Sequence, residues 1–407
     1  MAEILKPHSS TEVRDIIRAA AADKQTLEIL GAGSKRGWGR PLETSAVMDM
    51  SLLSGISLYE PEELVLSAGA GTPMNVIHQA LVQHHQQLAF EPPDFSPLYG
   101  GAAGDGTLGG VIAANISGPR RLQAGAARDH FLGFGAISGR GEEFKSGGRV
   151  VKNVTGFDLS KLLAGSFGTL AAMTMMTLKV LPAPEKTRTV LVVGLEEKAA
   201  IEALSETLQG SYEVNAAAHL PADIAAKSSV SYVAASGRSI TAVRLQGPAP
   251  SAEMRCEGVR ALWQPLGEIE ELHGHNSASL WQEIGDVALL LDNSEDQIWR
   301  LSVPPAEGAA VVESLKSQID CEAYFDWGGG LIWLAADGAL GEVAKLARSA
   351  IAQSGGHATL LRGSQELRLA EDVFQPQARE LQRLTKTLKE NFDPEGVLNP
   401  GRMYEGL

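Results

Sequence analysis

Cysteine is scarce in this chain of 407 residues, which contains only Cys256 and Cys321. Two cysteines are too few for a disulfide framework or for an iron–sulfur or zinc site, and we therefore expect a reducing, cytoplasmic compartment. Positive charge is also in deficit, because 35 Lys and Arg stand against 49 Asp and Glu, a net charge of −14. That balance argues against a nucleic-acid partner and against an anionic membrane surface.

Targeting segments and long apolar helices are also lacking. The N-terminus has no basic segment followed by an apolar one, so we expect no secretory signal. Residues 162–178 form a stretch of 17 residues without a charge. That length is at the lower limit for a membrane span, and its Gly, Ser and Thr content favours buried strands instead. We expect no span in this chain, and any membrane association would occur through a partner.

Glycine, by contrast, is abundant, with 44 residues. The glycines are concentrated between Gly31 and Gly168, which indicates backbone that passes close to a ligand. The length exceeds what one hydrophobic core usually supports, so two domains are expected. The apolar share of 44% and the charged share of 21% are those of an ordinary globular protein.

The first ninety residues alternate between helix and strand, which predicts a small α/β subdomain. Ser9 and Glu12 form a capping-box pattern before a helix, and Thr72 followed by Pro73 predicts the start of another. The sequence Pro182-Ala-Pro184 marks a boundary, which ends the first domain at residue 182. The strands expected before that boundary span residues 27–30, 47–50, 64–68, 131–137, 149–154 and 170–181.

Residues 186–350 differ in sequence pattern from the residues before them, and they predict a separate α+β domain. We expect helices at 196–208 and 340–353 and strands at 241–245 and 331–334. A terminal segment, 355–407, follows and contains a helix at 378–391.

A glycine loop follows the buried strand at 27–30. Small residues there let backbone N–H groups converge on an anion, and a hydroxyl and an ammonium group add to them, so a pyrophosphate is the expected guest. The rival is a Rossmann loop, for which Asp49 would be the ribose-binding acid. Its third glycine is displaced to Gly37, and Gly39 and Pro41 disfavour the helix that it needs. For this loop alone, a solvent-exposed turn stays open. The loop residues are Gly31, Ala32, Gly33, Ser34 and Lys35.

Three further segments repeat this character at residues 105–118, 148–162 and 165–170. Each brings small residues together with hydrogen-bonding side chains in an apolar context. Four such loops within about 140 residues indicate an extended ligand that is touched at several points.

Together these segments resemble the PCMH-type FAD-binding domain shared by vanillyl-alcohol-oxidase-type flavoproteins and by D-lactate and glycolate dehydrogenases. They are most similar to the FAD-binding E subunits of bacterial glycolate oxidase, over essentially the whole chain. The middle and C-terminal stretches are specific to that subunit family, whereas the loops alone indicate only FAD. The stretches that carry the resemblance are residues 108–115, 128–129, 152–158, 165–170, 299–304, 326–329, 359–362 and 392–401.

The resemblance implies an α+β fold in three parts: a two-subdomain FAD-binding domain at 1–182, an inserted α+β cap domain at 186–350, and a segment at 355–407 that returns to the FAD domain. Some relatives attach FAD covalently through a His or Cys of the first loop. This loop has neither, so we expect non-covalent FAD. The family's Gly-Val-Ile after the fourth loop is replaced here by Ala171, Ala172 and Met173. The implied FAD-binding residues are Gly31, Ala32, Gly33, Ser34, Lys35, Thr107, Leu108, Gly109, Gly110, Asn115, Ser117, Gly118, Gly168, Thr169 and Met173.

The resemblance also implies a subunit of a complex that oxidises glycolate to glyoxylate, with a homologous FAD-containing D-type subunit and an iron–sulfur F-type subunit as partners. Related chains carry a histidine pair and an acid in the cap. Here His273 and His275 indicate a solvated turn and His357 stands alone, so we predict no metal site. Weak candidates for the substrate site are Arg362, Asn399 and Arg402, with surface ion pairs as the alternative role for the arginines.

We therefore expect this chain to bind FAD and pass electrons, while its homologous partner carries out most of the substrate oxidation. Three alternatives stay open. They are a self-sufficient FAD-dependent 2-hydroxy-acid dehydrogenase, a structural subunit without its own catalysis, and a nicotinamide-dependent dehydrogenase. The loop glycines count against the second, and the sequence after Gly37 counts against the third.

Overall fold

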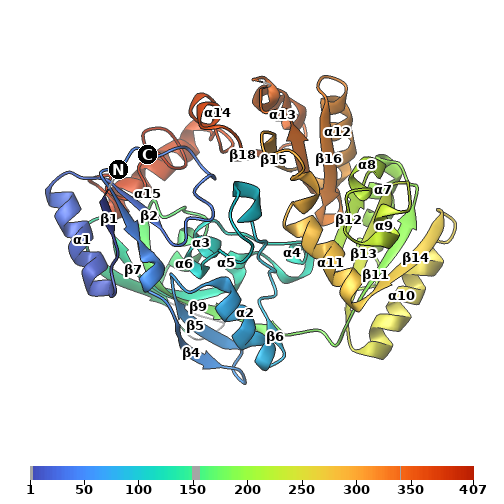
Figure 1. Cartoon of the computed structure of the whole chain (residues 1–407), viewed down its shortest axis with the longest axis horizontal. Helices are drawn as coiled ribbons and strands as arrows, with labels where there is room; N and C mark the ends of the chain where they lie inside the picture. The colour runs from blue at the N-terminus through green and yellow to red at the C-terminus, as the bar shows by residue number, and fades with distance from the viewer. Residues whose placement is uncertain (1–2, 149–155, 340) are drawn as a thin grey trace. The chain divides into compact units, whose positions relative to one another are not determined.

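The computed structural model describes residues 3–148, 156–339 and 341–407 (Figure 1). The chain divides into two compact units, each made of separate stretches. Unit 1 comprises Met1–Ser117, Gly125–Ala183 and Pro376–Leu407, and unit 2 comprises Gly118–Ala124 and Pro184–Gln375.

The division differs from the expected domain limits at two places. Residues 118–124 belong to unit 2, and unit 2 extends to Gln375 instead of ending near residue 350. The second difference arises because strand β18 (His357–Arg362) pairs along β15 (Gln297–Ser302), which makes it an edge strand of the unit 2 sheet.

A three-stranded parallel sheet begins unit 1, in the order β1 (Glu3–Leu5), β3 (Ala46–Asp49), β2 (Leu27–Leu30). Helix α1 (Ser10–Ala22) buries its apolar side chains in the same core as this sheet. As predicted, Ser9 caps the helix by accepting a hydrogen bond from the backbone N–H of Glu12. Val397 and Leu398 of the C-terminal stretch complete this core. Residues at the two ends of the chain thus share one hydrophobic cluster.

A five-stranded antiparallel sheet forms the rest of unit 1. Short helices pack beside it, namely α3 (Leu108–Ala113), α5 (Ala127–His130) and α6 (Leu159–Leu163). The strands predicted at 64–68, 131–137 and 170–181 correspond to three of its five strands, whereas the strands at Ile56–Glu60 and Glu143–Gly147 were not predicted. The strand expected at 149–154 lies outside the described residues. No helix in the described part of the chain has the length and apolarity needed to cross a membrane. The strands are, in sheet order, β4 (Ile56–Glu60), β5 (Val65–Gly69), β9 (Ala171–Lys179), β7 (Phe131–Ser138) and β8 (Glu143–Gly147).

Helix α2 (Met74–Gln83) begins differently from the prediction, which placed Thr72 at the N-cap. Pro73 occupies that position instead, in extended conformation and without a side-chain cap. The hydroxyl of Thr72 donates to the carbonyl of Gly69 at 2.7 Å, so it stabilises the preceding turn. A short strand pair follows, β6 (Gln86–Gln87) with β10 (Leu181–Pro182).

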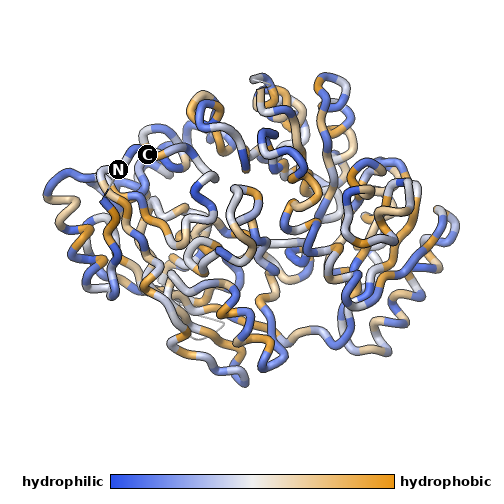
Figure 2. Tube along the Cα trace, in the orientation of Figure 1, coloured by the Kyte–Doolittle hydropathy of each residue, from blue (hydrophilic) through white to orange (hydrophobic). Residues whose placement is uncertain are grey.

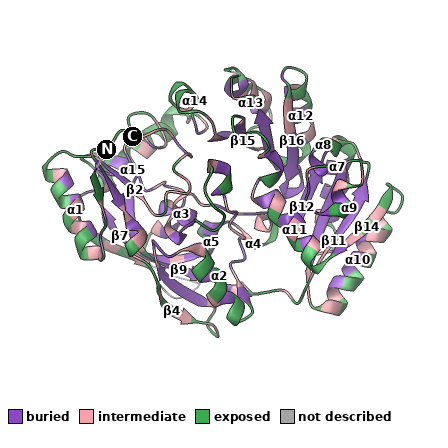
Figure 3. Ribbon diagram, in the orientation of Figure 1, coloured by how far each residue is buried: buried purple, intermediate pink, exposed green. Residues whose placement is uncertain are grey.

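Unit 2 is built on an eight-stranded antiparallel sheet. Its strands are largely apolar and buried (Figures 2 and 3). The predicted strands at 241–245 and 331–334 belong to it, and helices cover both of its faces. The strands are, in sheet order, β14 (Glu268–His273), β11 (Lys186–Val193), β13 (Ile240–Gly247), β12 (Ala216–Leu220), β16 (Cys321–Asp326), β17 (Leu331–Ala336), β15 and β18.

The remaining helices connect these strands or flank them. The longer ones of unit 2 are α7 (Glu197–Gln209), α10 (Ala249–Trp263), α11 (Gly274–Gly285), α12 (Gly308–Lys316) and α13 (Val343–Ile351). Its short helices are α4 (Arg121–Ala124), α8 (Ala222–Ala225), α9 (Ser231–Ala234) and α14 (Gln365–Ala370). Helix α15 (Arg379–Phe392) returns the chain to unit 1. The 3₁₀ turns span Met50–Leu52, Pro97–Tyr99, Ala288–Leu290, Pro305–Glu307 and Trp327–Gly329.

Candidate functional site

Unit 1 contains a pocket of about 850 Å³, part of it open to solvent. The first glycine loop, the start of α3, the fourth loop and the C-terminal return segment all contribute to its walls. The pocket therefore lies where four segments distant in sequence meet. Its lining residues are Glu28, Ile29, Leu30, Gly31, Ala32, Gly33, Ser34, Lys35, Arg36, Met50, Ala70, Thr107, Gly109, Gly110, Ala113, Ala114, Phe167, Gly168, Ala171, Met173, Asn399 and Arg402.

The first glycine loop leaves β2 at Leu30 and has no room for side chains at its start. A Cβ added to Gly31 would lie 2.4 Å from Thr107 Oγ1, so only glycine fits. Gly33 adopts the left-handed conformation with φ 75°, and its missing Cβ faces open space. The loop therefore exposes backbone to the pocket, as a cradle for an anionic group requires.

Lys35 brings a positive charge into this pocket. Its Nζ donates to Ser34 Oγ at 3.1 Å. Burial lowers the pKa of Lys35 to about 8, although the carboxylate of Asp94 opposes that change. A pyrophosphate beside it would favour the charged form and raise the pKa again. The chemistry of the loop thus fits the phosphate-bearing part of FAD.

Helix α3 approaches the first loop closely because glycines line its first turn. Thr107 is the N-cap and accepts from the backbone N–H of Gly110. A Cβ on Gly109 would lie 2.8 Å from the carbonyl oxygen of Ala70, and one on Gly110 would lie 3.1 Å from Lys35 Cε. These contacts explain why the second segment needs small residues.

Asn399 connects three walls of the pocket. Its Oδ1 accepts from the backbone N–H of Ile29 at 2.7 Å, and its Nδ2 donates to the carbonyl of Phe167 at 2.7 Å. It adopts the left-handed conformation with φ 42°, which asparagine tolerates better than most residues. A Cβ on Gly168 would lie 2.8 Å from Asn399 Nδ2. Both ends of the Asn399 amide therefore bind backbone and hold β2, the fourth loop and the return segment together.

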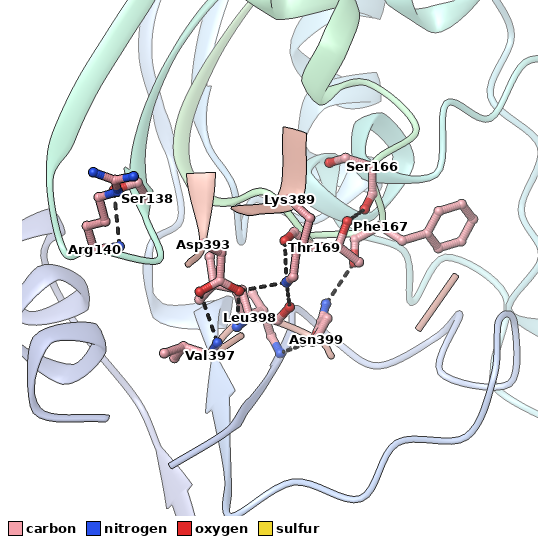
Figure 4. Close-up of polar contacts among 11 residues, drawn as sticks. Ser138, Arg140, Ser166, Phe167, Thr169, Lys389, Asp393, Val397, Leu398 and Asn399 are labelled. Atoms are coloured by element: carbon pink, nitrogen blue, oxygen red, sulfur yellow. Dashed lines mark hydrogen bonds and ion pairs between the residues drawn. The ribbon is translucent and has the colours of Figure 1, made fainter. Parts of the chain in front are cut away.

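A buried ion pair anchors the return segment beside this asparagine (Figure 4). Lys389 Nζ donates to Asp393 Oδ2 at 2.6 Å and to the carbonyls of Thr169 and Leu398 at 2.8 Å each. Asp393 also accepts from the backbone N–H groups of Val397 and Leu398. Burial lowers the pKa of Lys389, and its carboxylate partner opposes that change. This cluster fixes the end of α15 against the fourth loop.

The two candidate arginines also bind backbone carbonyls. Arg402 donates to the carbonyls of Arg36 at 3.0 Å and of Lys35 at 3.4 Å, so it holds the backbone at the end of the first loop. Arg362 lies in unit 2 and donates to the carbonyls of Asp296 and Asn293. Asn399 and Arg402 therefore both reach the pocket, whereas Arg362 belongs to the edge strand of the unit 2 sheet.

Ten of the fifteen implied FAD-binding residues line the pocket. The other five position the backbone around it or lie apart from it. Leu108 is the buried first residue of α3, and Gly118 belongs to unit 2. Three use their side chains within the loops. The Oδ1 atom of Asn115 accepts from Arg128 N, Ser117 Oγ accepts from Ala127 N, and Thr169 Oγ1 donates to the Ser166 carbonyl.

Several lining residues were not predicted from the sequence. Glu28 is buried on β2 and forms a two-pronged ion pair with Arg36, with Arg36 Nε 2.9 Å from Glu28 Oε1. A charged residue inside an otherwise apolar strand was the available signal. Met50, Ala70 and Phe167 carry no comparable signal, because apolar residues at strand ends and turns are common.

Two of the unit 2 histidines singled out from the sequence, His273 and His357, lie at the ends of strands. His273 ends β14 as the N-cap of α11, and its side chain is exposed and lies 3.3 Å from Glu271. His357 begins β18 and is exposed. Within residues 3–148, 156–339 and 341–407, no group of three or more His, Cys, Asp or Glu side chains could hold a metal ion.

A glycine-cradled pocket between a parallel α/β subdomain and an antiparallel one defines an FAD-binding unit, and comparisons with known proteins agree. Residues 1–147 match the family model for an FAD binding domain. The chain is 33% identical over 392 residues to the glycolate oxidase subunit GlcE of Escherichia coli, covering 96% of each chain. It is 27% identical to the glycolate oxidase subunit GlcD of Bacillus subtilis, covering 50% of this chain and 42% of GlcD.

Solved structures show the same architecture. The structure of p-cresol methylhydroxylase superposes with a TM-score of 0.73 at 14% identity, covering 99% of this chain and 88% of that one. The chain belongs to the GlcE family of FAD-binding oxidoreductases. The expected fold class and the expected FAD cofactor are thus confirmed. Non-covalent attachment of FAD stays a prediction.

Proposed function

We propose that this chain is the FAD-carrying subunit of a glycolate-oxidising complex and that it acts on glycolate or another short 2-hydroxy acid. The observation that carries the proposal is the extent of the similarity to GlcE, which covers 96% of both chains. That similarity therefore includes unit 2 and the return segment as well as the FAD-binding part. The match to GlcD covers only half of this chain.

The residues around the pocket support a defined division of roles. Gly31, Gly33 and Lys35 would hold the pyrophosphate, because they offer exposed backbone and a cation. Asn399 and Arg402 would keep the walls of the pocket in register through their bonds to backbone. FAD supplies the capacity to accept a hydride from the carbon that bears the hydroxyl group.

We propose further that the complex contains a homologous FAD-containing D-type subunit and an iron–sulfur F-type subunit, and that electrons leave the FAD of this chain for the iron–sulfur partner. The relationship to both GlcE and GlcD supports the first partner. The chain has only two cysteines, too few for an iron–sulfur centre of its own, so a partner would have to supply that centre. We retain the prediction that the homologous partner carries out most of the substrate oxidation.

The test uses the visible spectrum of the purified chain under anaerobic conditions. The chain should be yellow, and acid precipitation should release all flavin into the supernatant if attachment is non-covalent. Glycolate is then added to the chain alone and to the chain with its D-type and F-type partners. Bleaching only with the partners supports the partner-dependent proposal, and bleaching of the chain alone favours the self-sufficient dehydrogenase. A flavin that stays oxidised in both mixtures would contradict the proposed function.

A further inference from the structure

Two arginine side chains of unit 2 converge on one indole ring. The guanidinium carbon of Arg121 lies 4.5 Å from the ring centroid of Trp327, and that of Arg300 lies 5.2 Å from it. Arg300 also lies 6.0 Å from the ring centroid of Trp333. We call Arg121, Arg300 and Trp327 the arginine–tryptophan cluster. Two like charges that share one ring repel each other, so the cluster is suited to an anion between or beside them.

The fold holds Trp327 firmly in place. The residue follows β16 in a turn where it adopts φ 52°, a left-handed conformation that is costly for a bulky side chain. Its backbone N–H donates to Asp326 Oδ1 at 2.7 Å, and its indole Nε1 donates to the carbonyl of Gly118 at 3.2 Å. The second bond also joins the segment that carries Arg121 to the turn. Both ends of the indole-bearing residue are therefore fixed.

Arg300 lies on the face of the sheet opposite to α13. Its neighbour on β15, Trp299, is covered by Arg348 of α13, whose guanidinium carbon lies 5.7 Å from the ring centroid. Successive side chains of a strand point to opposite faces, so Arg300 points away from α13. Trp333 is its direct partner on β17 and shares that face. The arginine–tryptophan cluster is thus built on one face of the sheet.

The guanidinium of Arg300 is exceptional in its lack of polar partners. Across the described stretches of the chain, it forms no hydrogen bond and no ion pair, and it stacks on two indole rings. Arg244 provides the contrast within the same unit. It stacks on Trp281 at 5.3 Å, but its Nε donates to Asn215 Oδ1 at 2.7 Å. An arginine placed only for stacking would be expected to resemble Arg244, because donors that lose water without gaining a partner are unfavourable.

The electrostatics of the cluster also favour an anion. Burial, and after it the positive charge of Arg121, lower the pKa of Arg300 to about 10, and Asp326 opposes both effects. A bound anion would offset both. A guanidinium presents several N–H donors in one plane, which matches the two oxygens of a carboxylate. Both arginine residues are half-buried and keep part of their surface exposed to solvent.

We infer that Arg300 and Arg121 bind the carboxylate group of the 2-hydroxy acid, with Trp327 holding both guanidinium planes. This inference rests on the proposed function for the identity of the ligand, and on the geometry of unit 2 for the site. It assigns the carboxylate anchor to these two arginines instead of Arg362 and Arg402, because the side chains of Arg362 and Arg402 bind backbone carbonyls.

The test measures equilibrium binding of oxalate to the FAD-loaded chain by isothermal titration calorimetry. Oxalate carries carboxylates but no hydroxyl group to oxidise, so the result does not depend on turnover. Arg300→Gln and Arg121→Gln should each weaken oxalate binding by about tenfold or more, because each removes a charge-assisted hydrogen bond. Arg300→Lys should retain part of the affinity. Arg260→Gln, which removes a half-buried cation of the same unit that pairs with Glu271, should leave binding unchanged.

Three results would overturn the inference. The first is that the wild-type protein binds neither oxalate nor glycolate. The second is that both glutamine variants bind oxalate as the wild type does. The third is that inorganic phosphate binds as tightly as oxalate, which would indicate a general anion site. Circular dichroism of each variant shows whether it is folded, and the lysine variant provides a second reading if Arg300→Gln is not. Bleaching of the flavin by glycolate is measured as a separate experiment. If the protein binds oxalate but glycolate does not bleach the flavin even with the partners present, the proposed function is contradicted and the inferred carboxylate site is not.

Discussion

Replacing Lys389 with methionine should destabilise unit 1 strongly. The substitution removes all three hydrogen bonds of the ammonium group, to Asp393 and to the carbonyls of Thr169 and Leu398. It also leaves the carboxylate of Asp393, whose side chain has no exposed surface, without its counter-ion. Removing one partner of a buried ion pair costs about 3–5 kcal/mol. Asp393 keeps two backbone N–H donors, so we expect about 3 kcal/mol.

The assay is urea denaturation of the FAD-free chain, followed by circular dichroism. Added FAD identifies which transition belongs to unit 1, because a ligand raises the stability of the unit that binds it. Lys386→Met is the matched control, since Lys386 lies on the same helix but is exposed, and its pair with Glu390 should contribute less than about 1 kcal/mol. The double variant with Asp393→Asn should lose less than the single one, because no unpaired charge remains.

A loss below about 1 kcal/mol for Lys389→Met, or a loss equal to that of Lys386→Met, would refute this reasoning. It would mean that water reaches Asp393 when the lysine is gone. The FAD affinity offers a second reading. Of the carbonyls that Lys389 binds, that of Thr169 belongs to the fourth loop and that of Leu398 directly precedes Asn399, so the variant should also bind FAD more weakly than the control does.

Three further predictions concern the pocket. Gly31→Ala should weaken FAD binding by about tenfold or more, because the added Cβ would lie 2.4 Å from Thr107 Oγ1. The control Gly341→Ala should bind FAD normally, because a Cβ there meets open space. Equal FAD affinities of the two variants in fluorescence titrations would contradict the role of the first glycine loop in FAD binding. FAD affinity should be constant below pH 8 and fall above it, because Lys35 of the FAD-free protein then loses its proton, whereas Lys35 beside a bound pyrophosphate keeps it. The variant Lys35→Met should bind FAD less tightly and without this pH dependence. A wild-type FAD affinity that does not change with pH would contradict this role of Lys35. Asn399→Asp should cost about 1–3 kcal/mol of stability and weaken FAD binding, because a carboxylate cannot donate to the Phe167 carbonyl. Thermal unfolding is measured with and without FAD. A variant with the wild-type melting temperature in both conditions would contradict this prediction.

The glycine loops could be predicted from the sequence because their requirement is local. Gly31 and Gly33 follow a short, mostly apolar strand, and the run of small residues after that strand is visible in the sequence itself. The contacts that explain each glycine could not be predicted. Gly31 must be small because Thr107 lies against it, and Gly168 because Asn399 does. These neighbours are far away in sequence, and only the fold brings them together.

Charged residues were harder to interpret than glycines. Lys389 and Asp393 are spaced i, i+4 on a helix, which is also the spacing of an ordinary surface pair. Arg300 and Arg121 belong to different stretches of the chain and meet only because residues 118–124 join unit 2. Arg362 and Arg402 stood in motifs typical of the family, yet their partners are backbone carbonyls. Burial, which decides the role of a charge, does not show in local sequence.

The return segment has a consequence for the order in which the protein is made. The backbone of Leu27 forms hydrogen bonds with the backbone of Val397 and of Asn399. The backbone N–H of Ile29 donates to the side chain of Asn399, which lies 370 positions further along the chain. A ribosome synthesises residues 184–375 between the two halves of the pocket, which takes about 10–40 s at ~5–20 residues per second. The nascent first half must wait, with the β2 edge unpaired, until residues 397–402 emerge. Tight retention of FAD therefore marks a chain whose translation has passed the return segment.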